Sequence, residues 1–221
     1  ENTASGIWRN LTLADQFAAV LAENPDKVLL VEGEHQFTVA EIHRQTRALA
    51  SALQKRGLES GDVVSFELPN WPETVVIDLA CAMLGLVCNP IIPIYRDAEV
   101  SYILRDASSK AVFIPTTFRN FDYADMIARH RAQLPDLEHV ITVRGTADGA
   151  TSFEALLAEG EPESLRCPAV DPNAVKLIMY TSGTTGRPKG VLHSHNTIDT
   201  EIQAISKFLS LDSSDVILMP S

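Results

Sequence analysis

Short apolar runs alternate with longer stretches of mixed polarity along most of this chain. The runs suit buried strands, and the stretches between them repeat apolar residues at the three- to four-residue spacing of a helix. Strands are predicted at residues 27–32, 36–38, 62–68, 87–92, 111–115, 139–143 and 175–180. Helices are predicted at residues 12–24, 38–57, 70–85, 98–106 and 123–133. This order is typical of an α/β fold with a largely parallel sheet flanked by helices.

The ends of several predicted helices carry local signals. Thr12 is placed to cap the first helix, and Thr38 with Glu41 has the spacing of a capping box, in which each side chain bonds the other residue's backbone N–H. Gly57 and Gly85 stand where two helices should stop. The helix boundaries are therefore predicted from local chemistry as well as from periodicity.

Two segments depart from the alternation. Residues 144–173 are rich in Gly, Glu, Asp and Pro, which favours an internal linker with one short helix at residues 152–158. Residues 216–220 have the pattern of a strand whose neighbours in the sheet are partly missing. The most apolar stretch, residues 75–94, is interrupted by Asp78 and two prolines, whereas a spanning helix needs about 20 apolar residues. No transmembrane segment is predicted.

Composition and charge narrow the classes of partner. Apolar residues make up 45% of the 221 residues, enough for a sizeable core. With 18 Lys and Arg against 29 Asp and Glu, the formal charge is −11. A negative surface repels phosphodiester backbones, so no nucleic-acid partner is expected. An anionic nucleotide would need a local concentration of positive charge.

The cysteines indicate the compartment. Cys81, Cys88 and Cys167 lack the spacing of a metal site, and the first two lie in an apolar run that favours buried thiols. Their odd number favours a reducing compartment. Residues 1–10 are polar and lack the basic segment of a secretory signal. A cytoplasmic location is therefore expected.

One motif, residues 180–190, carries the candidate chemistry. Glycines without a Cβ let backbone N–H groups approach an anion, hydroxyls donate to phosphate oxygens, and a lysine adds a compact charge. The residues proposed to bind the phosphates are Thr181, Ser182, Gly183, Thr184, Thr185, Gly186 and Lys189. The motif differs from a Walker A loop, because Lys189 follows Pro188 and is not followed by Ser or Thr. The alternative, a polar surface loop with an incidental lysine, does not explain why the motif follows an apolar strand directly.

Residues 178–189 resemble, without a departure, the AMP-binding signature of the superfamily of acyl-CoA synthetases, peptide-synthetase adenylation domains and luciferases. Residues 37–41 and 84–90 resemble two earlier family motifs, and His195 stands where the family usually has histidine. The resemblance implies that residues 1–221 are the N-terminal part of the large AMP-binding domain, about two fifths of a full enzyme, without the C-terminal domain. Residues 66–73 and 90–96 look most like medium-chain fatty or alicyclic acid–CoA ligases.

The activity that this resemblance implies has two steps. A small-molecule carboxylic acid would attack ATP to give an acyl adenylate, and CoA would then form the thioester, with Mg²⁺ as the metal. Lys189 is the implied catalytic residue, and no metal ligand is assigned. The alternatives are a peptide-synthetase adenylation domain or a nucleotide-binding module without catalysis. The isolated 221 residues are expected to be inactive, and the sequence favours no oligomeric state.

Two histidines after the motif have alternative readings. His193 and His195 flank Ser194, where a strand is expected to lead into a helix. A catalytic base is conceivable at this place, but helix capping or packing is the more common role for a histidine in such a position. The sequence favours the second reading.

Overall fold

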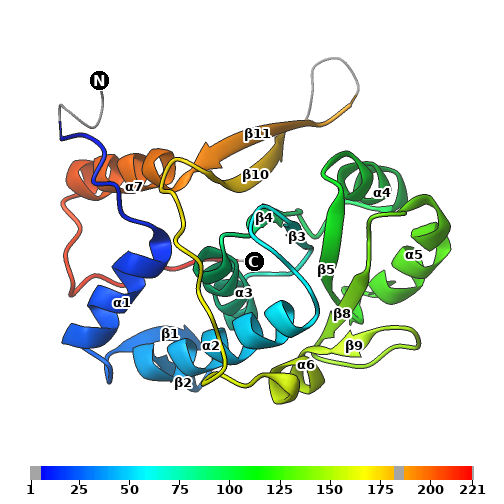
Figure 1. The fold of residues 1–221 in the computed structure, drawn as a ribbon, viewed down its shortest axis with the longest axis horizontal. Coiled ribbons are helices and arrows are strands. Elements are labelled where there is room, and N and C mark those ends of the chain that lie inside the picture. Colours follow the sequence, from blue (N-terminus) through cyan, green and yellow to red (C-terminus); the bar gives the residue numbers. More distant parts are fainter. Residues whose placement is uncertain (1–5, 182–186, 221) are drawn as a thin grey trace.

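A computed structural model describes residues 6–181 and 187–220. Within them, seven strands form one sheet in the order β11-β10-β4-β3-β5-β8-β9 (Figure 1). Their bounds are β3 (Val63–Phe66), β4 (Val87–Pro90), β5 (Ser109–Pro115), β8 (His139–Val143), β9 (Thr151–Ser152), β10 (Val175–Thr181) and β11 (Lys189–Ser194). Neighbouring strands are parallel, except that β10 and β11 form an antiparallel hairpin. The predicted α/β class with a largely parallel sheet is confirmed.

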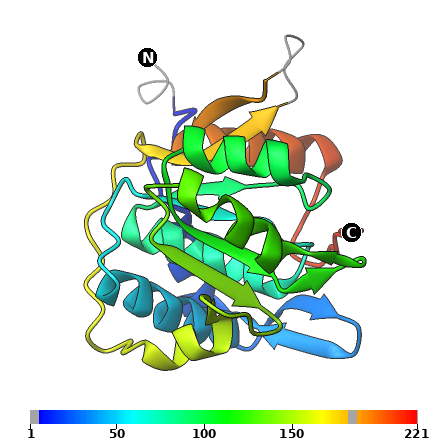
Figure 2. The same cartoon turned by 90° about the vertical axis from the view of Figure 1, so that its right-hand side faces the viewer.

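Helices cover both faces of the sheet (Figures 1 and 2). One face packs against α1 (Leu13–Glu23), α2 (Val39–Lys55), α3 (Pro72–Leu84) and α6 (Phe153–Glu159). The other packs against α4 (Asp97–Asp106) and α5 (Tyr123–His130), and the 3₁₀ turn η1 (Arg131–Gln133) follows α5. The last helix, α7 (His195–Leu209), follows β11. Two small hairpins, β1 (Val28–Glu32) with β2 (His35–Thr38) and β6 (Thr117–Phe118) with β7 (Phe121–Asp122), lie outside the main sheet.

The two layers of core follow from the alternation of side chains along the strands. On β5, Ala111 and Phe113 belong to the cluster under α2 and α3, and Val112 and Ile114 belong to the cluster under α4 and α5. Successive side chains of a strand point to opposite faces, so a continuous apolar run fills both layers. This explains why the central strands read as unbroken apolar runs.

The predicted helix ends are present. The Thr12 hydroxyl accepts a hydrogen bond from the Asp15 N–H at 3.1 Å, and the Thr38 hydroxyl accepts one from the Glu41 N–H at 3.2 Å, both within capping boxes. Gly85 ends α3 with φ 68°. This left-handed conformation suits glycine, and a Cβ there would lie 2.6 Å from the Ser60 hydroxyl oxygen.

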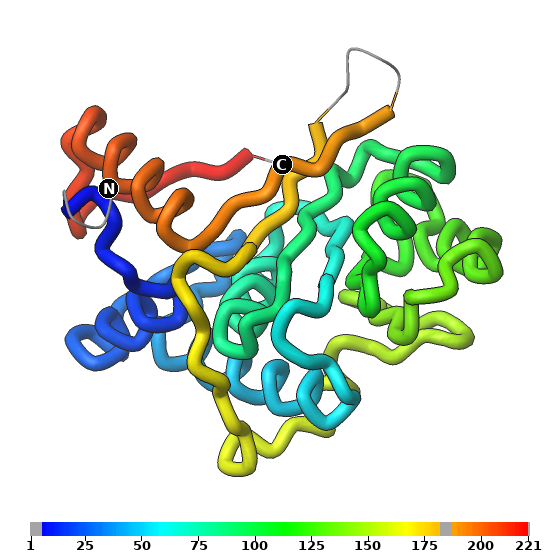
Figure 3. Tube along the Cα trace, turned by 45° about the horizontal axis from the view of Figure 1, so that its top comes forward, coloured from blue at the N-terminus to red at the C-terminus, as the bar shows by residue number. Residues whose placement is uncertain are grey.

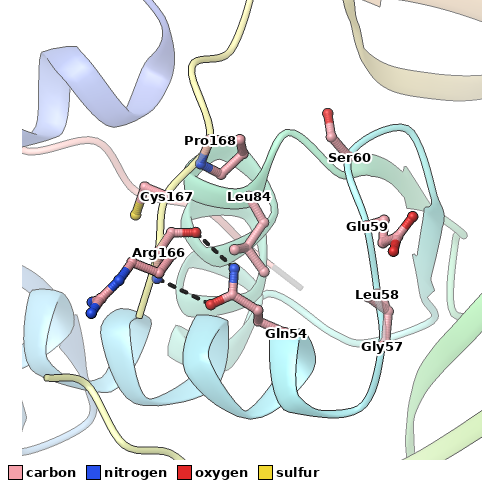
Figure 4. A pocket seen from close by; sticks show the side chains of 9 residues that line it. All are labelled: Gln54, Gly57, Leu58, Glu59, Ser60, Leu84, Arg166, Cys167 and Pro168. Atoms are coloured by element: carbon pink, nitrogen blue, oxygen red, sulfur yellow. Dashed lines mark hydrogen bonds between the residues drawn. The ribbon is translucent and has the colours of Figure 1, made fainter. Parts of the chain in front are cut away.

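Segment 144–173, the expected internal linker, contains β9 and α6 and lies against α2. The Glu161 N–H donates to the Ser51 hydroxyl at 3.0 Å, and that hydroxyl donates to the Glu161 carbonyl at 2.9 Å. Gln54 bonds both backbone groups of Arg166, at 2.7 and 3.0 Å (Figure 4). Glu161 and Arg166 belong to the long connection from α6 to β10, whose course is visible in Figure 3. The segment is therefore held at several points, and its role as a linker stays a prediction.

The strand prediction for residues 216–220 is wrong. These residues form no regular element, and none of the described strands pairs with them. Val216 is 92% exposed. The segment is held by a hydrogen bond from the Asn70 side-chain amide to the Pro220 carbonyl at 3.1 Å. Apolar, β-branched composition favours a strand only where a partner strand is available.

Candidate nucleotide-phosphate site

The signature motif begins on β10 and ends on β11. Thr181, the last residue of β10, pairs in register with Lys189, the first residue of β11. Both residues are exposed, and Lys189 has no ion-pair partner within the described part of the chain. The other predicted phosphate ligands, Ser182, Gly183, Thr184, Thr185 and Gly186, lie outside the described residues. The hairpin thus brings one hydroxyl and the lysine of the predicted set together.

The hairpin stands at the carboxyl edge of the parallel sheet. Because β10 runs parallel to β4, and β4 parallel to β3, the strand ends at Thr181, Pro90 and Phe66 lie along the same edge (Figure 1). In open α/β sheets, ligands bind outside the carboxyl ends of the strands. The place of the motif in the fold therefore suits a ligand-binding role, and the exposed ammonium of Lys189 suits an anionic ligand.

Tyr180 anchors the base of the motif. Its hydroxyl donates to the Asp106 carboxylate at 2.7 Å, and its ring packs against the core layer under α4 and α5. Burial, together with the adjacent Asp106 carboxylate, raises the pKa of Tyr180 above its ordinary value. The phenol therefore remains a hydrogen-bond donor at physiological pH.

His195 has a packing role. It is the first residue of α7 and is 4% exposed, and its Nδ1 accepts a hydrogen bond from the Leu13 N–H at 3.1 Å. Burial lowers its pKa, and the nearby Lys176 ammonium adds to this effect. His193 lies half-buried on β11. The geometry of His195 agrees with the packing role that the sequence favours.

An ion pair lies beneath the hairpin. The Lys176 ammonium, on β10, lies 2.5 Å from the Asp78 carboxylate on α3, and the Lys176 side chain is 6% exposed. Its pKa is raised above the ordinary value: desolvation opposes this shift, but the charge and hydrogen bond of Asp78, together with Cys88 and Cys81, outweigh it. The ion pair with Asp78 therefore gives Lys176 a structural role, which is to hold β10 against α3, rather than a role in binding a ligand. Sequence reasoning did not single out this pair, whose partners are 98 residues apart.

Glu67 is a second residue that sequence reasoning missed. It follows β3 at the carboxyl edge, is 0% exposed, and neither carboxyl oxygen has a hydrogen-bond partner among the described residues. Burial raises the pKa of Glu67 to about 9, although the Arg96 guanidinium opposes the shift. At neutral pH the carboxyl is protonated. The available signal was an acidic residue inside the apolar run of residues 62–68.

The structure has a cavity of about 400 Å³ away from the motif (Figure 4). It lies between the carboxyl ends of α2 and α3, beside Gly57 and Leu84, and is bordered by Arg166 and Cys167. These helix ends precede the amino ends of β3 and β4, so the cavity belongs to the edge opposite the motif. It has no part in the candidate site.

The described residues supply no evident metal centre. Over residues 6–181 and 187–220, no group of three or more His, Cys, Asp or Glu side chains is arranged to hold a metal ion. The same residues include no helix long and apolar enough to cross a membrane.

The fold and the position of the motif are those of an α/β domain with a candidate anion site, and the comparisons with known proteins show its family. Residues 17–221 match the family model described as "AMP-binding enzyme", and the chain belongs to this family. The Escherichia coli K12 protein "Medium-chain fatty-acid--CoA ligase" is 33% identical over 98% of this chain and 38% of its own length. The Bacillus subtilis 168 protein "2,3-dihydroxybenzoate-AMP ligase" is 27% identical over 97% of this chain and 39% of its own length.

A solved structure supports the same assignment. The apo structure of Mycobacterium smegmatis MbtA superposes with a TM-score of 0.84 at 26% identity, over 97% of this chain and 39% of that chain. The present chain therefore spans about two fifths of the length of the relatives it matches. It corresponds to the N-terminal portion of the AMP-binding domain.

Proposed function

We propose that the full-length protein is an ATP-dependent carboxylic acid–CoA ligase, and that the loop from Thr181 to Lys189 holds the β- and γ-phosphates of ATP. The observation that carries the proposal is the pairing of Thr181 with Lys189, both exposed, at the carboxyl edge of the sheet. Membership of the AMP-binding family and similarity to a medium-chain fatty-acid–CoA ligase support it. Medium-chain or alicyclic acids are the proposed substrates.

The proposed reaction begins when a carboxylate oxygen attacks the α-phosphorus of ATP. The new O–P bond forms the acyl adenylate as the bond to the bridging oxygen breaks, and pyrophosphate leaves with the electron pair. The CoA thiol, after losing its proton, then attacks the acyl carbon and displaces AMP. Lys189 and Thr181 would stabilise the negative charge that grows on pyrophosphate, which is how enzymes of phosphoryl and adenylyl transfer lower their barriers.

Mg²⁺ is part of this proposal as a partner of the ATP phosphates, whose charge it would neutralise. No metal ligand is assigned to the described residues.

A cytoplasmic location is proposed as well. The two thiols Cys81 and Cys88 are buried and unbridged, which supports a reducing compartment.

The test is acid-dependent ATP–pyrophosphate exchange by the purified full-length protein, followed by addition of CoA. We expect exchange with a medium-chain or cyclic acid in the absence of CoA, and AMP with thioester once CoA is added. The primary amide of the same acid is the matched control, because it lacks the attacking carboxylate. Exchange without thioester formation would favour the alternative of adenylate transfer to another acceptor, which similarity to an AMP ligase supports. No exchange with any acid would favour a nucleotide-binding module.

A further inference from the structure

Helix α4 contacts the base of the signature hairpin through Asp106, its last residue. The Tyr180 hydroxyl, on β10, donates to Asp106 Oδ2 at 2.7 Å. Tyr180 directly precedes Thr181, so this bond lies next to the first residue of the proposed phosphate loop. The two partners are 74 residues apart in sequence, and α4 lies beside the hairpin in both ribbon views (Figures 1 and 2).

Gly190 makes room for this contact. It pairs with Tyr180 across the hairpin, and a Cβ on Gly190 would lie 3.3 Å from Tyr180 Cζ and 3.5 Å from the Tyr180 hydroxyl oxygen. The same Cβ would lie 2.9 Å from Cγ2 of Ile178. The Tyr180 ring therefore lies against the backbone of β11, next to Lys189. The last glycine of the motif is explained by this packing rather than by contact with a phosphate.

The segment just before β11 also contacts α4. The Arg187 guanidinium lies over the Tyr102 ring at 5.8 Å from its centroid, and Tyr102 is one helical turn before Asp106. Helix α4 is itself fixed to the core by Ile103 and Leu104, which are buried. It therefore supports the end of β10 and the residue two positions before β11.

Asp106 is unfavourable for the helix that carries it. An aspartate in the last turn faces the negative end of the helix dipole. Removing its charge should stabilise α4 slightly rather than weaken it. Within α4, Asp106 accepts a long hydrogen bond from the Tyr102 hydroxyl, at 3.4 Å, whereas the bond from Tyr180 is much shorter, at 2.7 Å, and gives the stronger reason for an acid at this position.

We propose that Asp106 is a positioning residue that holds Thr181 and Lys189 in place for ATP by fixing Tyr180 across Gly190. This inference rests on the proposed function of the loop. A small displacement of a binding group can cause a large loss of activity. Because Thr181 and Lys189 are proposed to bind ATP, loss of their support should weaken the binding of ATP and leave the binding of the carboxylic acid unchanged. Because the Tyr180 hydroxyl remains protonated, the bond persists across physiological pH.

The test compares full-length wild type with Asp106→Ala, Asp106→Asn and Tyr180→Phe. In acid-dependent exchange, Asp106→Ala and Tyr180→Phe should raise the KM for ATP about 3- to 10-fold, the range expected for one hydrogen bond, and leave the KM for the acid within about 2-fold. Asp106→Asn should restore much of the loss, because its amide oxygen still accepts from Tyr180. Tyr102→Phe is the matched control: it removes the longer hydrogen bond from the Tyr102 hydroxyl to Asp106 Oδ1, at 3.4 Å, keeps the ring under Arg187 and leaves the Tyr180 bond intact.

A double variant and a measurement without turnover complete the test. Combining Tyr180→Phe with Asp106→Ala should raise the KM for ATP no further than either change alone. Equal changes in both KM values, no rescue by Asp106→Asn, or no change at all would overturn the proposal. If wild type shows no ATP–pyrophosphate exchange with any acid, the proposed function fails, and amide hydrogen exchange then tests the positioning role separately. Backbone amides of residues 187–194 should exchange with solvent faster in Tyr180→Phe than in Tyr102→Phe. Equal rates would overturn the positioning role.

Discussion

Lys189 is the residue on which the chemical proposal depends most. It is exposed at the first position of β11 and has no ion-pair partner among the residues that the structure describes, so its charge is available to a ligand. The chain as a whole carries a formal charge of −11. ATP must therefore be attracted by local groups against an unfavourable overall field, and a single uncompensated cation at the sheet edge has a large effect.

Replacing Lys189 with Ala in the full-length protein should reduce acid-dependent ATP–pyrophosphate exchange about 10- to 150-fold. This range corresponds to the loss of one charge-assisted contact, about 1.5–3 kcal/mol. The melting temperature should change little, because the side chain is exposed. Lys207→Ala, which removes an exposed lysine from the last turn of α7, is the control for net charge. Unchanged exchange in Lys189→Ala would remove this residue from the mechanism.

Glu67 makes the stability of the fold depend on pH. Its pKa is about 9 in the folded chain, against an ordinary value of 4.5. Between these values the folded chain holds a proton that the unfolded chain has lost, so the free energy of unfolding falls as pH rises. Below the lower value both states are protonated and the effect disappears. By the same linkage, burial of Glu67 lowers the free energy of unfolding at pH 7 by at most roughly 3 kcal/mol.

Glu67→Gln should therefore stabilise the full-length protein at pH 8 and have a much smaller effect at pH 5. The amide has nearly the shape of the protonated acid and cannot ionise. Chemical unfolding at the two pH values measures the difference, and Glu34→Gln, an exposed change in the β1–β2 turn, is the control. A gain of equal size at both pH values would show that ionisation of Glu67 is not the cause.

At the scale of helices and strands, features set by neighbouring residues could be predicted and features set by distant ones could not. The cap at Thr12 and the capping box at Thr38 depend on residues three positions apart, and both predictions are confirmed. The order of the strands and helices predicted over residues 12–180 follows from hydrophobic spacing and is confirmed as well, whereas the short strands β6, β7 and β9 were not predicted. The family could be predicted because the motif that carries the resemblance is contiguous.

The missed contacts join residues far apart in the chain. The bond between Tyr180 and Asp106 becomes visible only once α4 is placed beside β10. The wrong strand at residues 216–220 has the same origin, because a strand is defined by a neighbour that composition does not reveal. The roles expected of Ser182, Thr184 and the other loop residues outside the described part of the chain stay predictions.

Gly160 tests whether segment 144–173 is an integral part of the fold. A Cβ at this position would lie 2.2 Å from the Ala48 carbonyl oxygen of α2, which is backbone and cannot move aside cheaply. Gly160→Ala should therefore lower the free energy of unfolding by about 1–3 kcal/mol, the usual cost of overpacking. Urea unfolding of the full-length protein measures this change. The control is Glu163→Ala, an exposed position in the same segment, and equal stability of both variants would show that the segment is only loosely attached to α2.

At the scale of the whole molecule, the segment from α7 to residue 220 exposes many apolar side chains. The exposed apolar side chains are Ile202, Ile205, Phe208 and Leu209 on α7, and Val216, Ile217, Leu218 and Met219 after it. Phe208 and Leu218 are each 86% exposed. Exposed apolar side chains that gather along one segment are typical of surfaces that become covered by other protein. The relatives contain more than twice the length of chain that is aligned here, which is ample to cover such a surface.

The isolated chain of residues 1–221 should therefore not make acyl-CoA. Under the proposed function, Lys189 and Thr181 contact only the phosphate tail of ATP. Adenylation also needs the acid and the α-phosphate held in register, and such orientation can contribute ~7–11 kcal/mol to a reaction. Calorimetry should detect weak ATP binding or none, and the exposed face of α7 should lead to self-association, measurable by sedimentation at increasing concentration. Asp mutations at Phe208 and Leu218 should reduce association without restoring activity, because they change the exposed surface and supply no missing catalytic group. Steady production of AMP and thioester by the isolated chain would contradict this prediction and place a complete active site within these 221 residues.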